Sequence, residues 1–433
     1  MIKRLLWCSF FALGLSAQAE QRPNILFVYL DDFGWKDTGY MGSDFYETPN
    51  IDRLAKQGMI FTDAYSTSAN CAPARACLLS GQYTPRHQVY NVGTRPRGDA
   101  RHRRLEHVIG TNKLRLDIVT WAEALQKAGY RTGMFGKWHL GAPPIEQGFE
   151  VAVEHNKIPG MRGHIGRNGE YLADVLTGKA LEFISNSKGK PWCAYLSHYA
   201  VHVPLQAKRD IIKKYEAKKP GRLHQHAVMA AMIESVDEGV GRLVAKLEET
   251  GQRDNTIIFF FSDNGGYGPA TDMAPLHGYK GNYFEGGIRV PFFVNWPGKI
   301  QGGQKSAEPI IGVDLYPTFL ELAGGDRPGQ PLDGVSLVSL FRGRKESLGR
   351  RPLYWHFPAY LQSYDVYEEQ RDPLFRTRPC SVIRLGDWKL HEYFEDGALM
   401  LYNLRDDIGE QKDLAKKRPQ LVKKLYSMLQ SWR

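Results

Sequence analysis

Two short, uninterrupted apolar runs constrain the fold of this chain most strongly. Residues 24–30 read Asn-Ile-Leu-Phe-Val-Tyr-Leu, and residues 256–262 read Thr-Ile-Ile-Phe-Phe-Phe-Ser. Such runs are typical of strands buried on both faces of a parallel sheet. Weaker strand candidates lie at 131–135 and 192–196, and helical patterns lie between them at 49–58, 117–129, 171–185 and 225–250. This alternation predicts an α/β fold, with a large, mostly parallel sheet sandwiched by helices.

The character of the chain changes after about residue 325. Residues 324–331 form a Gly- and Pro-rich connector. Beyond it come short strand-like segments at 353–357, 381–385, 388–394 and 400–402, and a helical pattern near 419–429. We therefore expect a large α/β domain over residues 20–330, and a smaller C-terminal antiparallel subdomain with a helix over residues 331–433.

The N-terminus has the pattern of a secretory signal peptide. Lys3 and Arg4 precede an apolar core over residues 5–15, and Ala17-Gln18-Ala19 is a small-x-small cleavage site. The alternative is a buried N-terminal helix. No later apolar run is long enough to cross a bilayer. We expect cleavage after Ala19, no transmembrane segment, and export to the periplasm or the medium.

Composition excludes several classes of protein. With 433 residues, of which 42% are hydrophobic, the chain is neither a disordered tail, a collagen-like repeat nor a small disulfide scaffold. The net charge of +10 favours anionic partners but is too small for a protein that coats nucleic acid. The four cysteines beyond the signal segment are too few to hold the fold together, and a Cys71–Cys77 bridge would have poor geometry on one helical segment. The sequence does not show the oligomeric state.

Polar side chains follow each of the four predicted strands. The clusters are Asp31-Asp32, Lys137-Trp138-His139, His198 with His202, and Asp263-Asn264. In open α/β sheets, ligands bind beyond the carboxyl ends of the strands. We therefore expect these four clusters to converge on one crevice.

The oxygen-bearing residues among them predict a metal site. Asp31, Asp32, Asp263 and Asn264 offer three carboxylates and one amide oxygen. Carboxylates this close repel one another unless a cation compensates them. All-oxygen ligation suits a hard cation, calcium or magnesium, and the absence of a Cys/His ligand pattern argues against zinc. We prefer calcium, which tolerates irregular geometry and is abundant outside the cytoplasm.

The segment Cys71-Ala72-Pro73-Ala74-Arg75 carries the most specific signal. A proline two residues after the cysteine suits the first turn of a helix, which places Cys71 near an N-terminus that favours anions. Through this segment and the blocks around it, the chain resembles the formylglycine-dependent sulfatases of the alkaline phosphatase superfamily, whose motif is Cys-x-Pro-x-Arg. The similar blocks are 24–32, 48–52, 71–81, 136–139, 201–204, 263–266, 278–291, 314–318 and 401–404.

The resemblance implies a chemical role for the motif cysteine. In these enzymes a separate maturation enzyme oxidises the cysteine to Cα-formylglycine, and the hydrated aldehyde attacks sulfur. Cys71 occupies that position. The family's metal ligands match Asp31, Asp32, Asp263, Asn264 and the modified Cys71. The residues that match those holding the formylglycine and the sulfate are Arg75, Lys137, His139, His202 and Lys280, with His202 as the general acid.

Some neighbouring residues receive structural roles. His198 fits the expected His-x-Pro pattern less well than His202 does. Glu285 and Arg289 are expected to form an internal ion pair beneath the site. Cys77, at a position where family members often carry a small or polar residue, is expected to be a buried small hydrophobe.

An arginine-rich segment suggests the substrate class. The five arginines are Arg95, Arg97, Arg101, Arg103 and Arg104. They form either a solvated basic loop or a rim that binds further sulfate or carboxylate groups of a polyanionic sugar. Together with export, this favours a sulfated polysaccharide or oligosaccharide as substrate, without showing which sugar, which hydroxyl, or exo versus endo action.

Two other functions stay open at this point. A phosphatase or phosphonate hydrolase of the same superfamily would use a similar site, although phosphate esters usually recruit two metals or extra lysines. A non-catalytic protein that binds anionic glycans would leave Cys71 unmodified. Such a protein would need few of the cationic residues that the sequence retains around the cysteine.

Overall fold

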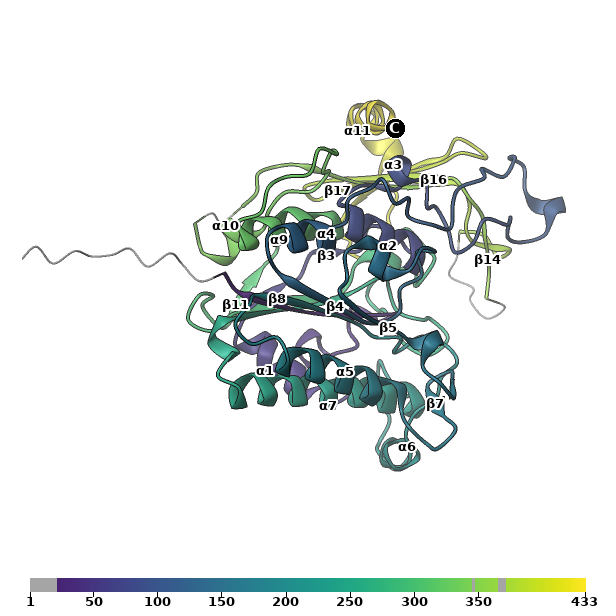
Figure 1. Cartoon of the computed structure of the whole chain (residues 1–433). Coiled ribbons are helices and arrows are strands. Elements are labelled where there is room, and N and C mark those ends of the chain that lie inside the picture. Colours follow the sequence, from purple (N-terminus) through teal and green to yellow (C-terminus); the bar gives the residue numbers. More distant parts are fainter. Residues whose placement is uncertain (1–21, 345–346, 365–370) are drawn as a thin grey trace, which may run out of the picture.

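An eight-stranded mixed sheet forms the centre of the molecule (Figure 1). The computed structural model describes residues 22–344, 347–364 and 371–433, so the predicted signal peptide lies outside the described residues. In spatial order the strands are β11 (Gln304–Ser306), β2 (Met59–Phe61), β10 (Phe292–Asn295), β9 (Thr256–Ser262), β1 (Asn24–Leu30), β8 (Trp192–Ser197), β4 (Arg131–Gly136) and β5 (Val151–Glu154). The five strands from β9 to β5 are parallel, and β10 runs antiparallel to both of its neighbours.

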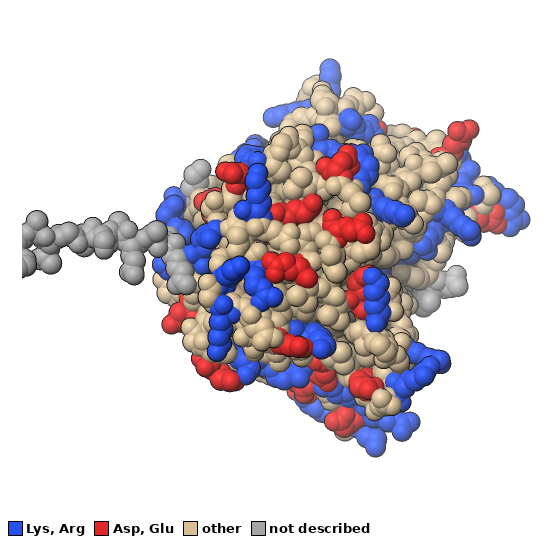
Figure 2. Space-filling view, viewed as in Figure 1, with Lys and Arg blue, Asp and Glu red and all other residues tan. Residues whose placement is uncertain are grey.

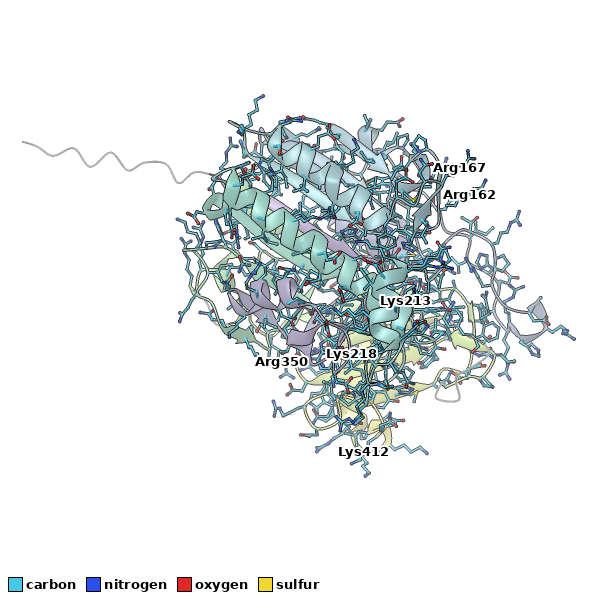
Figure 3. All side chains as sticks on the ribbon, turned by 90° about the horizontal axis from the view of Figure 1, so that it is seen from below. Arg162, Arg167, Lys213, Lys218, Arg350 and Lys412 are labelled. Atoms are coloured by element: carbon cyan, nitrogen blue, oxygen red, sulfur yellow. The ribbon has the colours of Figure 1, made fainter. Side chains whose placement is uncertain are left out.

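Helices cover both faces of this sheet (Figure 1). One layer contains α1 (Pro49–Lys56), α5 (Leu172–Ser185), α6 (Arg209–Glu216) and α7 (Ala227–Glu249). Seen from that side in Figure 3, these helices lie next to one another, with the label of Lys213 on α6. The opposite layer contains α2 (Cys71–Ser80), α4 (Trp121–Lys127), α9 (Leu315–Ala323) and α10 (Val338–Phe341).

Aromatic packing holds the second of these layers to the sheet. The Trp121 indole of α4 makes edge contacts with the rings of Tyr195 on β8 and Phe319 on α9. Phe319 in turn contacts Phe27 of β1 and Phe259 of β9. Since aromatic side chains bury large apolar areas, these contacts position α4 and α9 across the middle of the sheet.

A smaller antiparallel sheet lies above that layer (Figure 1). Its strand order is β13 (Pro352–Phe357), β16 (Cys380–Leu385), β17 (Trp388–Tyr393) and β18 (Leu399–Asn403), and α11 (Pro419–Trp432) packs on it through Leu425 and Leu429. The remaining short elements are β3 (Ala64–Tyr65), α3 (Thr84–His87), β6 (Met161–Arg162), β7 (Ile165–Gly166), α8 (Glu285–Ile288), β12 (Ile310–Ile311), β14 (Leu361–Gln362) and β15 (Phe375–Thr377).

Buried ion pairs join this subdomain to the rest of the chain. Lys389 Nζ on β17 lies 2.9 Å from Glu285 Oε1 of α8 and 3.0 Å from Glu410 Oε1. Arg384 of β16 pairs with Asp63 at 2.6 Å. Because removing one partner of a buried pair leaves an uncompensated charge, these pairs fix how the subdomain sits on the large sheet.

The predicted fold class is confirmed, with differences at the edges. The helix expected over 117–129 begins only at Trp121, because Thr120 and Glu123 form a capping box. The antiparallel strand β10, its neighbour β2 and the edge strand β11 were not predicted, since three- and four-residue strands carry little periodicity. Phe341 of α10 contacts Phe61 and Phe259, so residues beyond the connector still pack with the large sheet, and the boundary at residue 330 remains a proposal.

Two further features bear on the sequence predictions. Cys71, Cys77, Cys193 and Cys380 are all free and buried. None of the helices in the described part of the chain has both the length and the apolarity of a bilayer-spanning segment.

The end of β4 gives a test of this packing. Gly136 has φ +125°, and an added Cβ would lie 1.8 Å from the carbonyl oxygen of Ser197. We expect Gly136→Ala to lower the free energy of unfolding by about 3 kcal/mol or more, as measured by urea denaturation.

Gly189 is the matched control. It also has positive φ, at +86°, but open space surrounds its Cβ position. Gly189→Ala should therefore lose only about 1 kcal/mol, from backbone strain alone. Equal losses in the two variants would show that the contact between β4 and β8 is not tight at this point.

Candidate active site

The four polar clusters meet at the carboxyl ends of β1, β4, β8 and β9, as the sequence predicts. They surround a pocket of about 520 Å³. The predicted catalytic and metal-ligand residues that line it are Asp32, Cys71, Lys137, His139, His202 and Lys280. Asp31, Asp263 and Asn264 are fully buried behind them.

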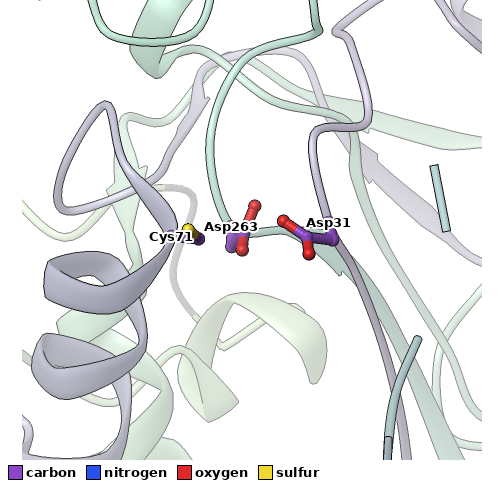
Figure 4. A group of neighbouring side chains, drawn as sticks. All are labelled: Asp31, Cys71 and Asp263. Carbon is purple, nitrogen blue, oxygen red and sulfur yellow. The ribbon is translucent and has the colours of Figure 1, made fainter. Parts of the chain in front are cut away.

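Cys71 is the first residue of α2, at the position its proline spacing predicts. Its side chain is 2% exposed and faces Asp263 and Asp31 (Figure 4). The Sγ atom and one carboxylate oxygen from each aspartate lie within 4.8 Å of one another. The helix ends at Gly81, which has φ +67° and whose N–H donates to Cys77 O.

Arg75 ties this helix to the ends of three strands. Its Nε and Nη2 donate to Asp263 Oδ2 at 3.0 and 2.8 Å, and its Nη1 donates to Lys137 O at 3.0 Å and to Ser197 Oγ. The guanidinium also lies over the Tyr29 ring at 5.0 Å. Since every one of these partners is buried, Arg75 holds α2 in one position relative to β9, β4 and β8.

Each site carboxylate has a cationic neighbour. Lys137 Nζ pairs with Asp31, and Lys280 Nζ lies 2.6 Å from Asp32 Oδ2. Burial raises the pKa of Asp31, but Lys137 and the other cations outweigh burial and bring the pKa well below its ordinary value. Burial and the charge of Asp31 raise the pKa of Asp263. A further positive charge at this point would favour the ionised form of Asp263.

The histidines differ in what they face. Burial, followed by the charge of Lys137, lowers the pKa of His139 to about 3, so this ring is neutral at pH 7. His202 Nδ1 lies 2.7 Å from Val203 O, which leaves Nε2 facing the pocket, 3.8 Å from Asp32 Oδ2. His198 is fully buried and does not line the pocket. The geometry therefore favours His202 over His198 for proton transfer.

The donor set fits a hard cation. Asp31 Oδ1 and Asn264 Oδ1 are buried and have no hydrogen-bond partner among the described residues. Buried polar atoms without a partner are uncommon and call for a bound ligand or water. A second group of potential ligand atoms contains Asp31, Asp32 and His202. Carboxylate and amide oxygens that converge in this way are the ligands of calcium and magnesium.

The arginine-rich segment projects from the molecule next to β14 and β15 (Figure 1) and contributes to the basic side chains at that edge (Figure 2). Arg97 lines the pocket. Arg101 pairs with Asp99 at 2.6 Å on the exposed loop. Arg95, Arg103 and Arg104 do not line the pocket.

Residues that were not predicted as site residues complete the pocket. They are Asn70, Asn91, Val92, Trp138, Glu154, His155, Asn156, Tyr199, Val203, Tyr267, Leu361, Gln362, Tyr364 and Arg376. Sequence reasoning missed Arg376 and His155, because neither belongs to a motif nor follows one of the predicted strands. The expected pair of Glu285 and Arg289 is present and buried, with Oε2 and Nη1 at 3.3 Å. Cys77 is buried, as expected, with its Sγ 3.2 Å from His87 Nε2.

Family comparisons cover almost the whole described chain. A family model described as Sulfatase matches residues 23–325, and one described as N-sulphoglucosamine sulphohydrolase, C-terminal, matches residues 277–433. A protein of Formosa agariphila described as a sulfatase is 33% identical, covering 96% of this chain and 89% of the relative. Human N-acetylgalactosamine-6-sulfatase is 31% identical over 79% of this chain and 70% of its own.

Solved structures show the same fold. Ps i-CgsB in complex with k-i-k-neocarrahexaose superposes with a TM-score of 0.77 and 30% identity, covering 95% of this chain and 93% of the other. The phosphonate monoester hydrolase of Agrobacterium radiobacter has a TM-score of 0.67 at 21% identity, covering 95% of each chain. This second likeness shows the fold alone.

The Arg75–Asp263 pair gives a test of the site's architecture. Arg75→Met removes the cation and leaves a buried carboxylate without compensation. We expect the free energy of unfolding to fall by about 3–5 kcal/mol in calcium-free buffer, as measured by urea denaturation. In Arg101→Met, which breaks an exposed pair, no measurable loss is expected. If both variants unfold like the parent protein, the Arg75 pair does not organise the site.

Proposed function

The chain belongs to the sulfatase family and is a sulfuric ester hydrolase, and on this basis we propose that it releases sulfate from a sulfated glycan with a formylglycine nucleophile derived from Cys71. The Sulfatase match over residues 23–325 spans more than half of the chain. The family resemblance that the sequence predicts is thereby confirmed.

The position of Cys71 is the observation that supports it as the proposed nucleophile. Cys71 stands at the start of α2, at the floor of the pocket, with its Sγ close to carboxylate oxygens of Asp31 and Asp263. The hydrated aldehyde of formylglycine would supply two hydroxyls, one to attack sulfur and one to expel sulfate when the hemiacetal collapses. A maturation enzyme acting on the Cys71 motif is the partner that this proposal requires.

The proposed metal is calcium, held by Asp31, Asp32, Asp263, Asn264 and the modified Cys71. When bound, it would supply positive charge that lowers the pKa of the nucleophile and neutralises a sulfate oxygen. Magnesium is the alternative. The unpartnered Oδ1 atoms of Asp31 and Asn264 support this ligand set.

The remaining site residues have distinct proposed roles. Arg75 and Lys137 position the nucleophile and its aspartates through their buried ion pairs. Lys280 and neutral His139 line the pocket with Cys71, where His139 would hold the formylglycine and Lys280 would hold sulfate oxygens. His202 presents Nε2 to the same space, so its protonated form would donate to the leaving oxygen. Such fixed donors stabilise the negative charge that spreads in the transition state.

A glycan is the substrate class that the relatives and the pocket support. Human N-acetylgalactosamine-6-sulfatase is named for a sulfated sugar, and Ps i-CgsB was solved with a carrageenan oligosaccharide. The pocket volume of about 520 Å³ suits a sugar ring as well as a sulfate group. The export that the sequence predicts, after cleavage behind Ala19, agrees with this proposal.

The rival functions have weaker support. The likeness to a phosphonate monoester hydrolase is one of fold, at 21% identity. A glycan-binding protein without catalysis would not need Arg75, Lys137, His139, His202 and Lys280 around the cysteine. Parallel assays of sulfate and phosphate release distinguish these functions.

Replacement of Cys71 tests the nucleophile. Cys71→Ala should lower sulfate release by at least about 1,000-fold, because the alanine variant lacks the formylglycine hydroxyl that would attack sulfur. Binding of a sulfated glycan, measured by calorimetry, should be retained. Cys77→Ala, on the same helix, should keep the activity of the folded enzyme. Retained turnover by Cys71→Ala would contradict the mechanism.

Calcium titration tests the metal ligands. At 100 times its dissociation constant, a ligand of the folded state adds about 2.7 kcal/mol of stability. We expect calcium to raise the melting temperature of the parent protein, whereas Asp263→Ala should lose this response together with activity. Asp174→Ala, a surface carboxylate outside the pocket, should keep both. An active Asp263→Ala enzyme without metal would refute the ligand assignment.

A further inference from the structure

The pocket above Cys71 is larger than one sulfate group needs, and the C-terminal subdomain supplies one of its walls. Leu361 and Gln362 of β14, Tyr364 just after it, and Arg376 of β15 line this wall. None of them has a role in the proposed reaction. The wall is therefore available to recognise the part of the substrate that surrounds the scissile ester.

Arg376 is the charged residue of this wall, and it is 8% exposed. Its Nε donates to Gln362 O at 2.9 Å, and its Nη1 donates to Lys280 O at 3.3 Å. The guanidinium lies 3.8 Å from the centre of the Tyr364 ring. Both of these hydrogen bonds go to main-chain carbonyls, and among the described residues no carboxylate forms an ion pair with it.

Most of the other charged groups around the pocket have a partner of opposite charge. Arg75, Lys137 and Lys280 pair with Asp263, Asp31 and Asp32. Glu154, which also lines the pocket, pairs with Lys157. Arg376 differs from them, because no described carboxylate forms an ion pair with it at a buried position, where desolvation is costly. Burial also lowers the pKa of Arg376 from its ordinary value. An anion of the substrate would compensate this charge.

A second arginine comes to the same side of the pocket. Arg97 is half-buried, lines the pocket, and donates from Nη2 to Val92 O at 2.9 Å. The next residue, Gly98, lies against β15, because a Cβ there would be 2.4 Å from a ring atom of Phe375. Arg97 precedes Gly98 and Arg376 follows Phe375, so the two arginines come from segments that lie side by side, and both line the pocket. Within the described residues, Arg97 has no carboxylate partner either.

We propose that Arg376 and Arg97 form a second anion subsite, which binds another sulfate or a carboxylate of the same glycan while the scissile sulfate faces Cys71. This inference rests on the proposed function and narrows it to glycans with at least two anionic groups near the cleaved ester. Guanidinium groups suit both anions, because their planar donors form paired hydrogen bonds with sulfate or carboxylate oxygens.

The test measures binding by calorimetry to the full chain carrying Cys71→Ala, in which turnover is blocked, with calcium present. Each ligand pair shares one sugar backbone and differs by one anion. A carrageenan oligosaccharide with two sulfates per repeat is compared with its one-sulfate counterpart, and a sulfated uronate disaccharide with its methyl ester. Preference in the first pair identifies a second sulfate as the ligand, and preference in the second pair identifies a carboxylate.

The expected result is that the more highly charged member of at least one pair binds about tenfold more tightly. Arg376→Gln and Arg97→Gln should each bring this ratio towards one, and Arg376→Lys should retain part of it. Arg350→Gln, which removes an exposed arginine outside the pocket (Figure 3), is the matched control and should keep the full ratio.

Two results would overturn the subsite: no preference in either pair, or a preference that survives both Gln substitutions. If Arg376 only supported the main chain at Lys280, its loss would weaken both members of a pair equally and leave the ratio unchanged. If Arg376→Gln fails to fold, the binding ratio of Arg97→Gln serves as the test instead.

Sulfate release by the active enzyme tests the proposed function separately. An enzyme that releases sulfate without this preference defeats the subsite, and one that shows the preference without releasing sulfate defeats the proposed function.

Discussion

The buried ion pair between Arg75 and Asp263 is the contact on which the rest of the site depends. Arg75 belongs to the helix that begins with Cys71, and Asp263 follows the central strand β9. A charge inside a protein is stable only with a partner and satisfied hydrogen bonds, so this pair allows little movement of the helix against the sheet. The Lys137–Asp31 and Lys280–Asp32 pairs repeat the same arrangement around the pocket. Each carboxylate can therefore be buried near the others, where a cation would bind.

The C-terminal subdomain contributes to this site as well as to the fold. Lys389 reaches Glu285 on α8, five residues beyond Lys280, and holds the segment that carries that lysine. Arg376 contacts the same segment through Lys280 O. The large sheet thus positions the proposed catalytic groups. The C-terminal subdomain closes one side of the pocket and supplies the positive charge that is proposed to bind the rest of the glycan.

Strong local signals were predictable from the sequence, and contacts between distant segments were not. The bounds of β1 and β9 follow from their apolar runs, and the start of α2 follows from the proline after Cys71. The convergence of Asp31, Lys137 and Asp263 follows from the rule that parallel strands place their carboxyl ends together. The short antiparallel strand β10 has no such signal. The position of Arg376 depends on the packing of β15 against the loop at Gly98. The periodicity of the sequence gives no sign of this contact. For the same reason the sequence could not distinguish Arg97 from its four neighbouring arginines.

The proposed reaction requires Cys71 as the precursor of its nucleophile. The most direct measurement is the mass of the peptide that contains Cys71, in protein purified from its native host. We expect the mass of the aldehyde or its hydrate in place of the thiol. An unmodified cysteine in native protein that releases sulfate would contradict the proposal, since sulfate release would then not require formylglycine.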